Sequence, residues 1–171
     1  VIAECEVVLP NYYSYWEGVS VDAAIKALHY QHRQVIAAAG ARPVIISETG
    51  WPSGGNTVGS AVPSPANASL YFLNFVSWAR ANSAAYFYFS GLDESWKAKY
   101  EGPQGACWGT HDKDGNLKPG MRRTLDGATM SDNWTANGGA PAIEFTFVPP
   151  YGSFQDLRGQ VWNVISTANR V

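Results

Sequence analysis

The 171-residue chain is long enough for one domain, with or without part of a second, and its 46% hydrophobic and 15% charged residues are typical of a globular protein. A formal net charge of −2 argues against the strongly basic surface that binds nucleic acids or anionic membranes. The sequence has no run of about twenty apolar residues, so no membrane-spanning segment is predicted.

The first predicted unit is a strand, a loop and a helix. Residues 7–9 are predicted as the opening strand, within a strand-like run over residues 1–9, and residues 10–18 form an aromatic and polar loop. Residues 21–39 have apolar side chains at helical spacing, with Gly40 placed as the terminator. Because the chain opens within the strand-like run and without an initiator Met, we expect it to be a piece of a longer protein.

The second unit repeats this order. Residues 43–47 are typical of a short buried strand, and Glu48 follows where that strand meets a Gly/Pro loop. Ser64 is expected to cap a helix that has Pro65 at its first position and Phe72, Phe75 and Trp78 in the core, and a third strand is predicted at residues 84–89. Three strands with two intervening helices indicate a parallel α/β arrangement with its function on one rim.

The local pattern around Glu48 allows two interpretations. In α/β barrels the chemistry lies at the carboxyl ends of the strands, so an acidic residue there beside Trp51 points to an active site. The alternative is a solvated loop carboxylate. The loop after the third predicted strand allows the same two interpretations. Glu94 and Lys97 form either an exposed ion pair or part of a site. Glu101 is either a solvated loop residue or part of the same site.

No metal or cofactor site is predicted. Cys5 and Cys107 lie far apart without metal-ligand spacing, and a disulfide between them is an open alternative. His29 and His32 share a predicted helix but have no evident third ligand, so we expect surface or core histidines. Residues 112–115 superficially resemble a calcium loop, but the later acidic ligands are missing and a hairpin turn is predicted.

The composition changes near residue 124. Residues 124–140 are rich in Gly, Asn, Ser and Thr without a helical period, which predicts a linker after a first domain at residues 1–123. Alternating side chains within residues 141–171 predict two strands. Since two strands cannot bury a sheet face by themselves, we expect these residues to start a β-rich accessory domain.

Two motifs carry a resemblance to a known family. They are Ser47-Glu48-Thr49-Gly50-Trp51-Pro52-Ser53 and Phe89-Ser90-Gly91-Leu92-Asp93-Glu94-Ser95-Trp96-Lys97. Both resemble motifs of glycoside hydrolase family 17, the β-1,3-glucanases and related glucosyltransferases, and Trp108-Gly109 lies where bacterial and fungal members carry the same pair. The resemblance implies an α/β fold, a partial (β/α)8 TIM barrel in which this chain supplies strands six to eight with their helices, so that the family's general acid would lie outside this sequence.

The resemblance also implies roles for individual residues. Glu48 matches the nucleophile of a retaining mechanism, which uses two carboxyls about 5–5.5 Å apart. Glu94 and Lys97 would belong to the catalytic surroundings, with Lys97 as a cation near Glu48, and Glu101 is a further candidate for the acidic surround. Sugar rings bind on aromatic platforms, and the candidates on loops of the predicted rim are Tyr13, Tyr15, Trp16, Trp51, Trp96 and Trp108.

The predicted function is therefore that of a retaining glycoside hydrolase that cleaves β-1,3-glucosidic bonds in glucans through a glycosyl-enzyme intermediate on Glu48. One alternative is a β-1,3-glucan transglycosylase, because a second sugar competes with water for the intermediate. Another is a noncatalytic carbohydrate-binding protein. The expected partner is a β-glucan polysaccharide or oligosaccharide, no cofactor is expected, the oligomeric state is open, and a secreted or cell-envelope location follows from that substrate.

Overall fold

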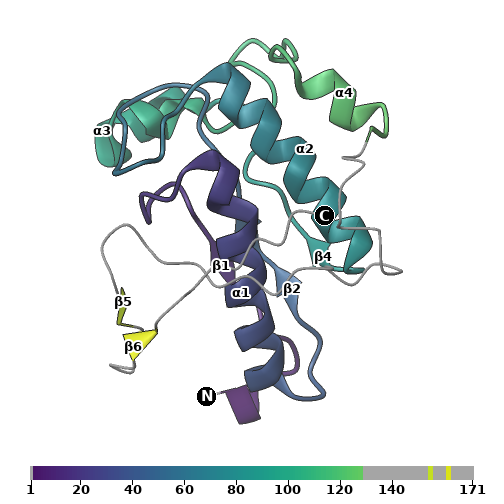
Figure 1. Cartoon of the computed structure of the whole chain (residues 1–171). Helices are drawn as coiled ribbons and strands as arrows, with labels where there is room; N and C mark the ends of the chain where they lie inside the picture. The colour runs from purple at the N-terminus through teal and green to yellow at the C-terminus, as the bar shows by residue number, and fades with distance from the viewer. Residues whose placement is uncertain (1, 129–153, 156–160, 163–171) are drawn as a thin grey trace, which may run out of the picture.

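The computed structural model describes residues 2–128, 154–155 and 161–162 (Figure 1). The elements in chain order are η1 (Ile2–Glu4), β1 (Asn11–Tyr12), α1 (Val21–Ala39), β2 (Ile45–Ile46), β3 (Glu48–Thr49), α2 (Pro65–Ala81), β4 (Ala85–Tyr86), η2 (Ser95–Lys97), α3 (Ala98–Glu101), η3 (Pro103–Cys107), α4 (Met121–Leu125), β5 (Phe154–Gln155) and β6 (Val161–Trp162).

Three strand segments pair in parallel within the described residues, at 8–12, 44–49 and 85–86, and the segment 44–49 lies in the middle. β1 pairs with β3, which sets Asn11 opposite Glu48, and β2 pairs with β4, which sets Ile46 opposite Tyr86. Helix α1 connects β1 to β2, and α2 connects β3 to β4. Parallel strands joined by helices are the predicted α/β arrangement.

The first strand extends further along the chain than the predicted residues 7–9. Residues 2–4 form the 3-10 turn η1, and pairing begins at Val8, which bridges to Val44, and continues at β1. Pro10 interrupts this strand without ending it, because proline lacks only the N–H group and its carbonyl still accepts from the Ser47 N–H at 2.9 Å. The aromatic loop therefore begins after Tyr12.

Helix α1 covers the predicted residues 21–39, and α2 starts where the sequence predicts. α1 ends at Gly40, whose φ of 63° lies in the left-handed region that glycine adopts without strain. At the start of α2, the Ser64 hydroxyl accepts a hydrogen bond from the Asn67 N–H at 3.0 Å, and Pro65 occupies the first helical position.

The core lies between these helices and one face of the strands. Figure 1 shows α1 and α2 side by side, with the strands next to them. The predicted core residues Phe72, Phe75 and Trp78 of α2 are buried. Tyr86 packs edge-on against Phe75 with ring centroids 4.8 Å apart, and Tyr88 packs against Phe72 at 4.5 Å.

The two histidines of α1 are core residues rather than metal ligands. His29 accepts a hydrogen bond from the Trp78 indole N–H at 3.0 Å, and His32 is hydrogen-bonded to the Tyr12 hydroxyl at 3.2 Å. Burial lowers the pKa of both, that of His29 to about 4 with smaller contributions from Arg33 and His32. Within the part of the chain that the structure describes, no group of three or more His, Cys, Asp or Glu residues is placed to hold a metal.

The remaining local predictions have mixed outcomes. The turn at residues 112–115 is confirmed, because Asp112 accepts from the backbone N–H groups of Asp114 and Asn116, and His111 pairs antiparallel with Leu117. The alternative of a disulfide is wrong for this structure, since Cys5 and Cys107 are not bonded to each other.

The predicted linker begins inside a helix. α4 includes residue 124, whose side chain is buried, and the Arg80 guanidinium donates to the Gly127 carbonyl at 3.2 Å, so the first unit extends past residue 123. Most of residues 124–140, and the predicted strand at 142–148, lie outside the described residues. Within residues 141–171 the structure describes one antiparallel pair, β5 with β6.

Candidate active site

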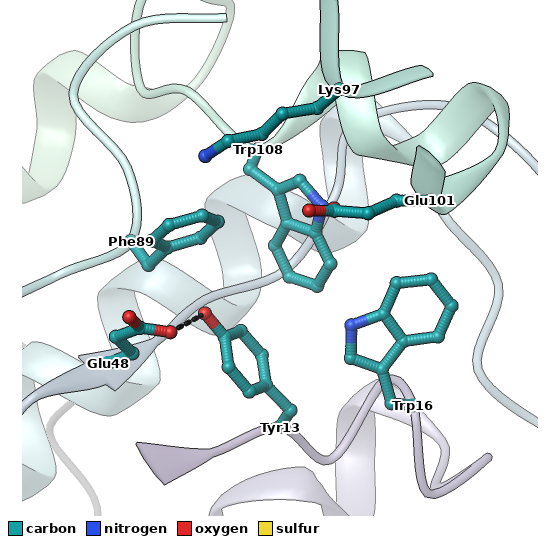
Figure 2. A pocket seen from close by; sticks show the side chains of 7 residues that line it. All are labelled: Tyr13, Trp16, Glu48, Phe89, Lys97, Glu101 and Trp108. Atoms are coloured by element: carbon teal, nitrogen blue, oxygen red, sulfur yellow. Dashed lines mark hydrogen bonds between the residues drawn. The ribbon is translucent and has the colours of Figure 1, made fainter. Parts of the chain in front are cut away.

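A pocket of about 470 Å³ lies at the carboxyl ends of the strands (Figure 2). Its walls come from the residues after β1, from β3, from the residues after β4 and from the segment that includes η2, α3 and η3. The lining residues are Tyr13, Trp16, Glu48, Phe89, Lys97, Glu101 and Trp108.

The strand pairing directs Glu48 into this pocket. Its neighbour Thr49 is buried on the helix side, where its hydroxyl and that of Tyr71 in α2 are hydrogen-bonded at 2.6 Å. Because successive side chains of a strand point to opposite faces, Glu48 projects away from the helices. Figure 2 shows its carboxylate at the pocket wall, next to the hydroxyl of Tyr13.

The hydrogen-bond donor to Glu48 is Tyr13. Its hydroxyl donates to Glu48 Oε2 at 2.7 Å, the contact drawn as a dashed line in Figure 2. Burial, this hydrogen bond and the negative charges of Glu48 and Glu101 all raise the pKa of Tyr13 above its ordinary value. The hydroxyl therefore stays protonated at neutral pH and holds the carboxylate in one orientation.

Lys97 lies in the same pocket but is engaged elsewhere. Its ammonium forms an ion pair with Glu94 and lies 4.2 Å from the centroid of the Phe89 ring, a cation–π contact. The hydrogen bond to Glu48 comes from Tyr13, while Lys97 lines the same pocket as Glu48, so its role as a nearby cation stays a prediction. Glu94 does not line the pocket; it forms an ion pair with Lys97, which does.

The aromatic rings of the pocket contact one another. Trp108 is at the centre, with its ring centroid 5.3 Å from that of Tyr13, 5.8 Å from Phe89 and 6.0 Å from Trp16. The sequence did not single out Phe89 as a site residue. The available signal was strand alternation, because Tyr88 faces α2 and the next side chain must face the other way.

Two of the predicted sugar platforms, Trp51 and Tyr15, are buried and do not line the pocket, whereas Trp108 lines it although it is only 2% exposed. Trp51 is 1% exposed, packs against Tyr15 and Tyr71, and donates its indole N–H to the Val62 carbonyl at 3.1 Å. Tyr15 is fully buried and donates its hydroxyl to the Asn56 carbonyl. The loop between β3 and α2 covers both side chains, so neither presents an open ring face to the pocket.

Trp96 lies beside the pocket rather than in its wall. It is 63% exposed and packs edge-on against the exposed ring of Tyr100, with centroids 6.4 Å apart. Lys97 and Glu101, the residues that follow these two, line the pocket. The segment that includes η2 and α3 thus contributes charged side chains to the pocket and aromatic ones to the adjoining surface.

Comparison with known proteins identifies the family. A profile of the BtgE/BtgC glycoside hydrolase domain matches residues 1–109, which is more than half of the chain. The chain belongs to this family. The predicted resemblance to glycoside hydrolase family 17 is confirmed by this match and by the relatives described below. All seven residues that line the pocket fall within the matched part of this BtgE/BtgC-type domain.

Several relatives of this BtgE/BtgC-type domain carry related names. The putative glucan endo-1,3-beta-glucosidase btgC of Aspergillus niger is 30% identical over 138 residues, covering 71% of this chain and 20% of that protein. The glucan 1,3-beta-glucosidase of Saccharomyces cerevisiae is 30% identical over 126 residues, covering 69% and 40%. The chain therefore spans about a fifth to two fifths of the length of these relatives.

A solved structure shares the fold of the BtgE/BtgC-type domain. The glycoside hydrolase family 17 beta-1,3-glucanosyltransferase from Rhizomucor miehei is 36% identical, with a TM-score of 0.66 over 71% of this chain and 44% of that one. An active-site mutant of the same enzyme has been solved in complex with laminaritriose and is similar to the same extent, with a TM-score of 0.65.

Proposed function

We propose that the protein processes β-1,3-glucans by a retaining mechanism in which Glu48 is the nucleophile. The observation that carries this proposal is the pocket itself, where the Glu48 carboxylate is held by the Tyr13 hydroxyl at 2.7 Å beside a group of aromatic rings. Aromatic faces suit the C–H faces of sugar rings, and a carboxylate is the usual nucleophile of retaining glycosidases. The names of the Aspergillus and Rhizomucor relatives support β-1,3-glucan as the substrate class.

In the proposed first step, a Glu48 oxygen attacks the anomeric carbon, a glycosyl ester forms, and the bond to the leaving sugar oxygen breaks. That leaving oxygen needs a proton from a second carboxyl group. In the second step an acceptor hydroxyl attacks the same carbon, releases Glu48 and returns a proton to that carboxyl group. We assign Glu101, the other carboxylate in the pocket wall, to hydroxyl binding, in line with the expectation that the family's general acid lies outside this sequence.

The acceptor decides between two outcomes. Water gives hydrolysis, whereas a second glucan gives a longer chain. Transglycosylation is the second candidate function, because the Rhizomucor structure with 36% identity is a glucanosyltransferase. A noncatalytic carbohydrate-binding protein, the alternative from another class, would share the pocket and bind glucan without turnover.

We also propose that the described units are strands six to eight of a TIM barrel, followed by a linker within residues 124–140 and the start of a β-rich module within residues 141–171. The parallel pairing with intervening helices supports the first part. We infer a secreted or cell-envelope location from the proposed substrate. None of the helices in the described ranges is long and apolar enough to cross a membrane.

The test is an assay of the full-length protein on laminari-oligosaccharides, with products separated by length. The variant Glu48→Gln keeps the shape of the side chain and removes the charge needed for attack. Glu17→Gln is the matched control, because Glu17 is an exposed carboxylate outside the pocket wall that is hydrogen-bonded to Gln31. Shorter products that vanish in Glu48→Gln alone would support hydrolysis, and longer products that vanish would support transfer.

Two results would contradict the proposal. Turnover that survives in Glu48→Gln would remove Glu48 from the nucleophile role. Binding of oligosaccharide without turnover in the unaltered protein would favour the noncatalytic alternative. Glu101→Gln separates binding from acid chemistry. If Glu101 binds a sugar hydroxyl, its replacement raises KM for glucans. If Glu101 is the general acid, its replacement lowers kcat on glucans and has a much smaller effect on aryl glucosides whose leaving groups need no proton.

A further inference from the structure

Three rim segments meet at the ammonium group of Lys118, a residue that follows the 112–115 turn and lies beyond the matched residues 1–109. Its Nζ donates to Asp93 Oδ1 at 2.6 Å, to the Ser53 hydroxyl at 2.8 Å and to the Cys107 carbonyl at 3.2 Å. These bonds use all three donors of a lysine. The side chains of Lys118 and Asp93 are 9% and 15% exposed, so this ion pair is largely shielded from water.

The ion pair holds the backbone on both sides of Trp108. Lys118 binds the carbonyl of the preceding residue, Cys107, while Asp93 Oδ1 accepts the N–H of the following residue, Gly109, at 2.9 Å. A side chain at position 109 would come within 2.4 Å of the Asp93 nitrogen, which shows how closely the two segments approach. The Ser53 N–H also donates to the Cys107 carbonyl at 2.9 Å, and the Ser90 N–H donates to the Trp108 carbonyl at 3.0 Å. The charged pair therefore adds one side-chain contact on each side of Trp108 to this backbone network.

Trp108 connects this pair to the nucleophile. Its ring is 2% exposed and lies edge-on to Tyr13 at 5.3 Å, and the Tyr13 hydroxyl donates to Glu48. A displacement of Trp108 would remove the support of the Tyr13 ring. Misplacement of a catalytic group by about 1 Å can lower a rate on the order of 100-fold.

We propose that Lys118 and Asp93 form a positioning pair that sets Trp108 and, through it, the Tyr13–Glu48 hydrogen bond. Neither Lys118 nor Asp93 is among the residues that line the pocket. A shielded ion pair contributes little net stability compared with apolar side chains of the same size, so stability alone does not account for it. Its directional contacts to Cys107 and Gly109 do supply a reason, because they fix the backbone at one position.

The experiment compares Lys118→Met with Lys113→Met in the full-length protein. Lys113 lies in the adjoining turn, and its ion pair with Asp114 is exposed to solvent, which makes it the matched control. This inference rests on the proposed function where activity is the readout. We expect Lys118→Met to lower kcat/KM on laminari-oligosaccharides on the order of 10- to 100-fold, and Lys113→Met to leave it unchanged.

A double-mutant cycle separates positioning from general loss of structure. In a Tyr13→Phe background the hydrogen bond to Glu48 is already absent, so Lys118→Met should have a several-fold smaller effect there than in the unaltered protein. Asp93→Asn combined with Lys118→Met should be no worse than Lys118→Met alone, because both changes break the same pair. Equal effects of Lys118→Met in both backgrounds would overturn the proposal.

A spectroscopic readout makes the inference independent of the proposed function. The protein is labelled with 5-fluorotryptophan, and the ¹⁹F resonance of Trp108 is assigned from its absence in Trp108→Phe. We expect this resonance to shift or broaden in Lys118→Met and to stay in place in Lys113→Met. An unchanged Trp108 resonance in folded Lys118→Met would overturn the inference even if no glucan is turned over, whereas absence of turnover and binding in the unaltered protein would overturn the proposed function alone.

Discussion

His29, one of the two buried histidines of α1, makes the fold sensitive to mild acid. His29 is 7% exposed, and its Nδ1 accepts the indole N–H of Trp78 at 3.0 Å. Burial, together with the nearby Arg33 and His32, lowers the pKa of His29 from 6.5 to about 4 in the folded protein. The folded state therefore keeps this ring neutral under conditions in which the unfolded chain protonates it.

The sign and size of the effect follow from proton linkage. Between about pH 6.5 and pH 4 the unfolded state binds a proton at His29 that the folded state does not, so the free energy of unfolding falls as the pH is lowered through this window. At pH 5 the loss is about 1 to 2 kcal/mol, after allowance for solvent screening and relaxation around the ring. Above about pH 6.5 the contribution of His29 to stability is fully present.

Urea unfolding of the full-length protein at pH 7 and pH 5, followed by tryptophan fluorescence, measures this loss. His29→Gln keeps a hydrogen-bond acceptor but does not titrate, so the variant should be less stable at pH 7 and lose about 1 to 2 kcal/mol less between the two pH values. His111→Gln, at the hairpin outside the helix layer, is the control with the same substitution. An unchanged pH dependence in His29→Gln would refute the reasoning.

Three further outcomes are expected. Tyr13→Phe removes the hydrogen-bond donor to Glu48, the proposed nucleophile, and should lower kcat on laminari-oligosaccharides on the order of 10- to 100-fold while leaving the melting temperature nearly unchanged; equal kcat values would contradict the role proposed for Tyr13. Gly50→Ala places a Cβ atom 1.9 Å from the Phe89 carbonyl oxygen and should abolish folding, as measured by a thermal shift assay. Gly91→Ala, with open space around it, should melt as the unaltered protein does. Trp51→Ala removes a buried ring and should lower the free energy of unfolding by about 3 to 5 kcal/mol. Trp96→Ala removes an exposed ring and should change the free energy of unfolding by less than about 0.5 kcal/mol, while weakening the binding of longer glucans as measured by calorimetry.

Local signals in the sequence were sufficient for the start of each long helix and for placing Glu48 at the end of a short strand. Gly40 ends α1 because its left-handed backbone suits a helix end, and Ser64 with Pro65 starts α2 because both meet the needs of the first turn. Glu48 was recognised from its place after a short apolar strand. In each case the deciding interactions lie within a few residues, so the sequence alone contains them.

The role of each aromatic residue was decided by the tertiary structure. Trp51 and Trp108 both follow strand ends in the sequence, yet the loop before α2 closes over the first and leaves the ring of the second in the pocket wall. Tyr13 was predicted as a sugar platform. It lines the pocket, and the strand pairing also brings its hydroxyl to Glu48, 35 residues later in the chain.

The same holds for the charged residues. Lys97 pairs with Glu94 three residues away, a local contact that the sequence suggested, whereas the pair of Lys118 with Asp93 joins positions 25 residues apart. Local signals in the sequence determine where the two long helices begin. Which side chains meet depends on the packing of parallel strands against their helices, because only that packing brings separate loops to the same rim.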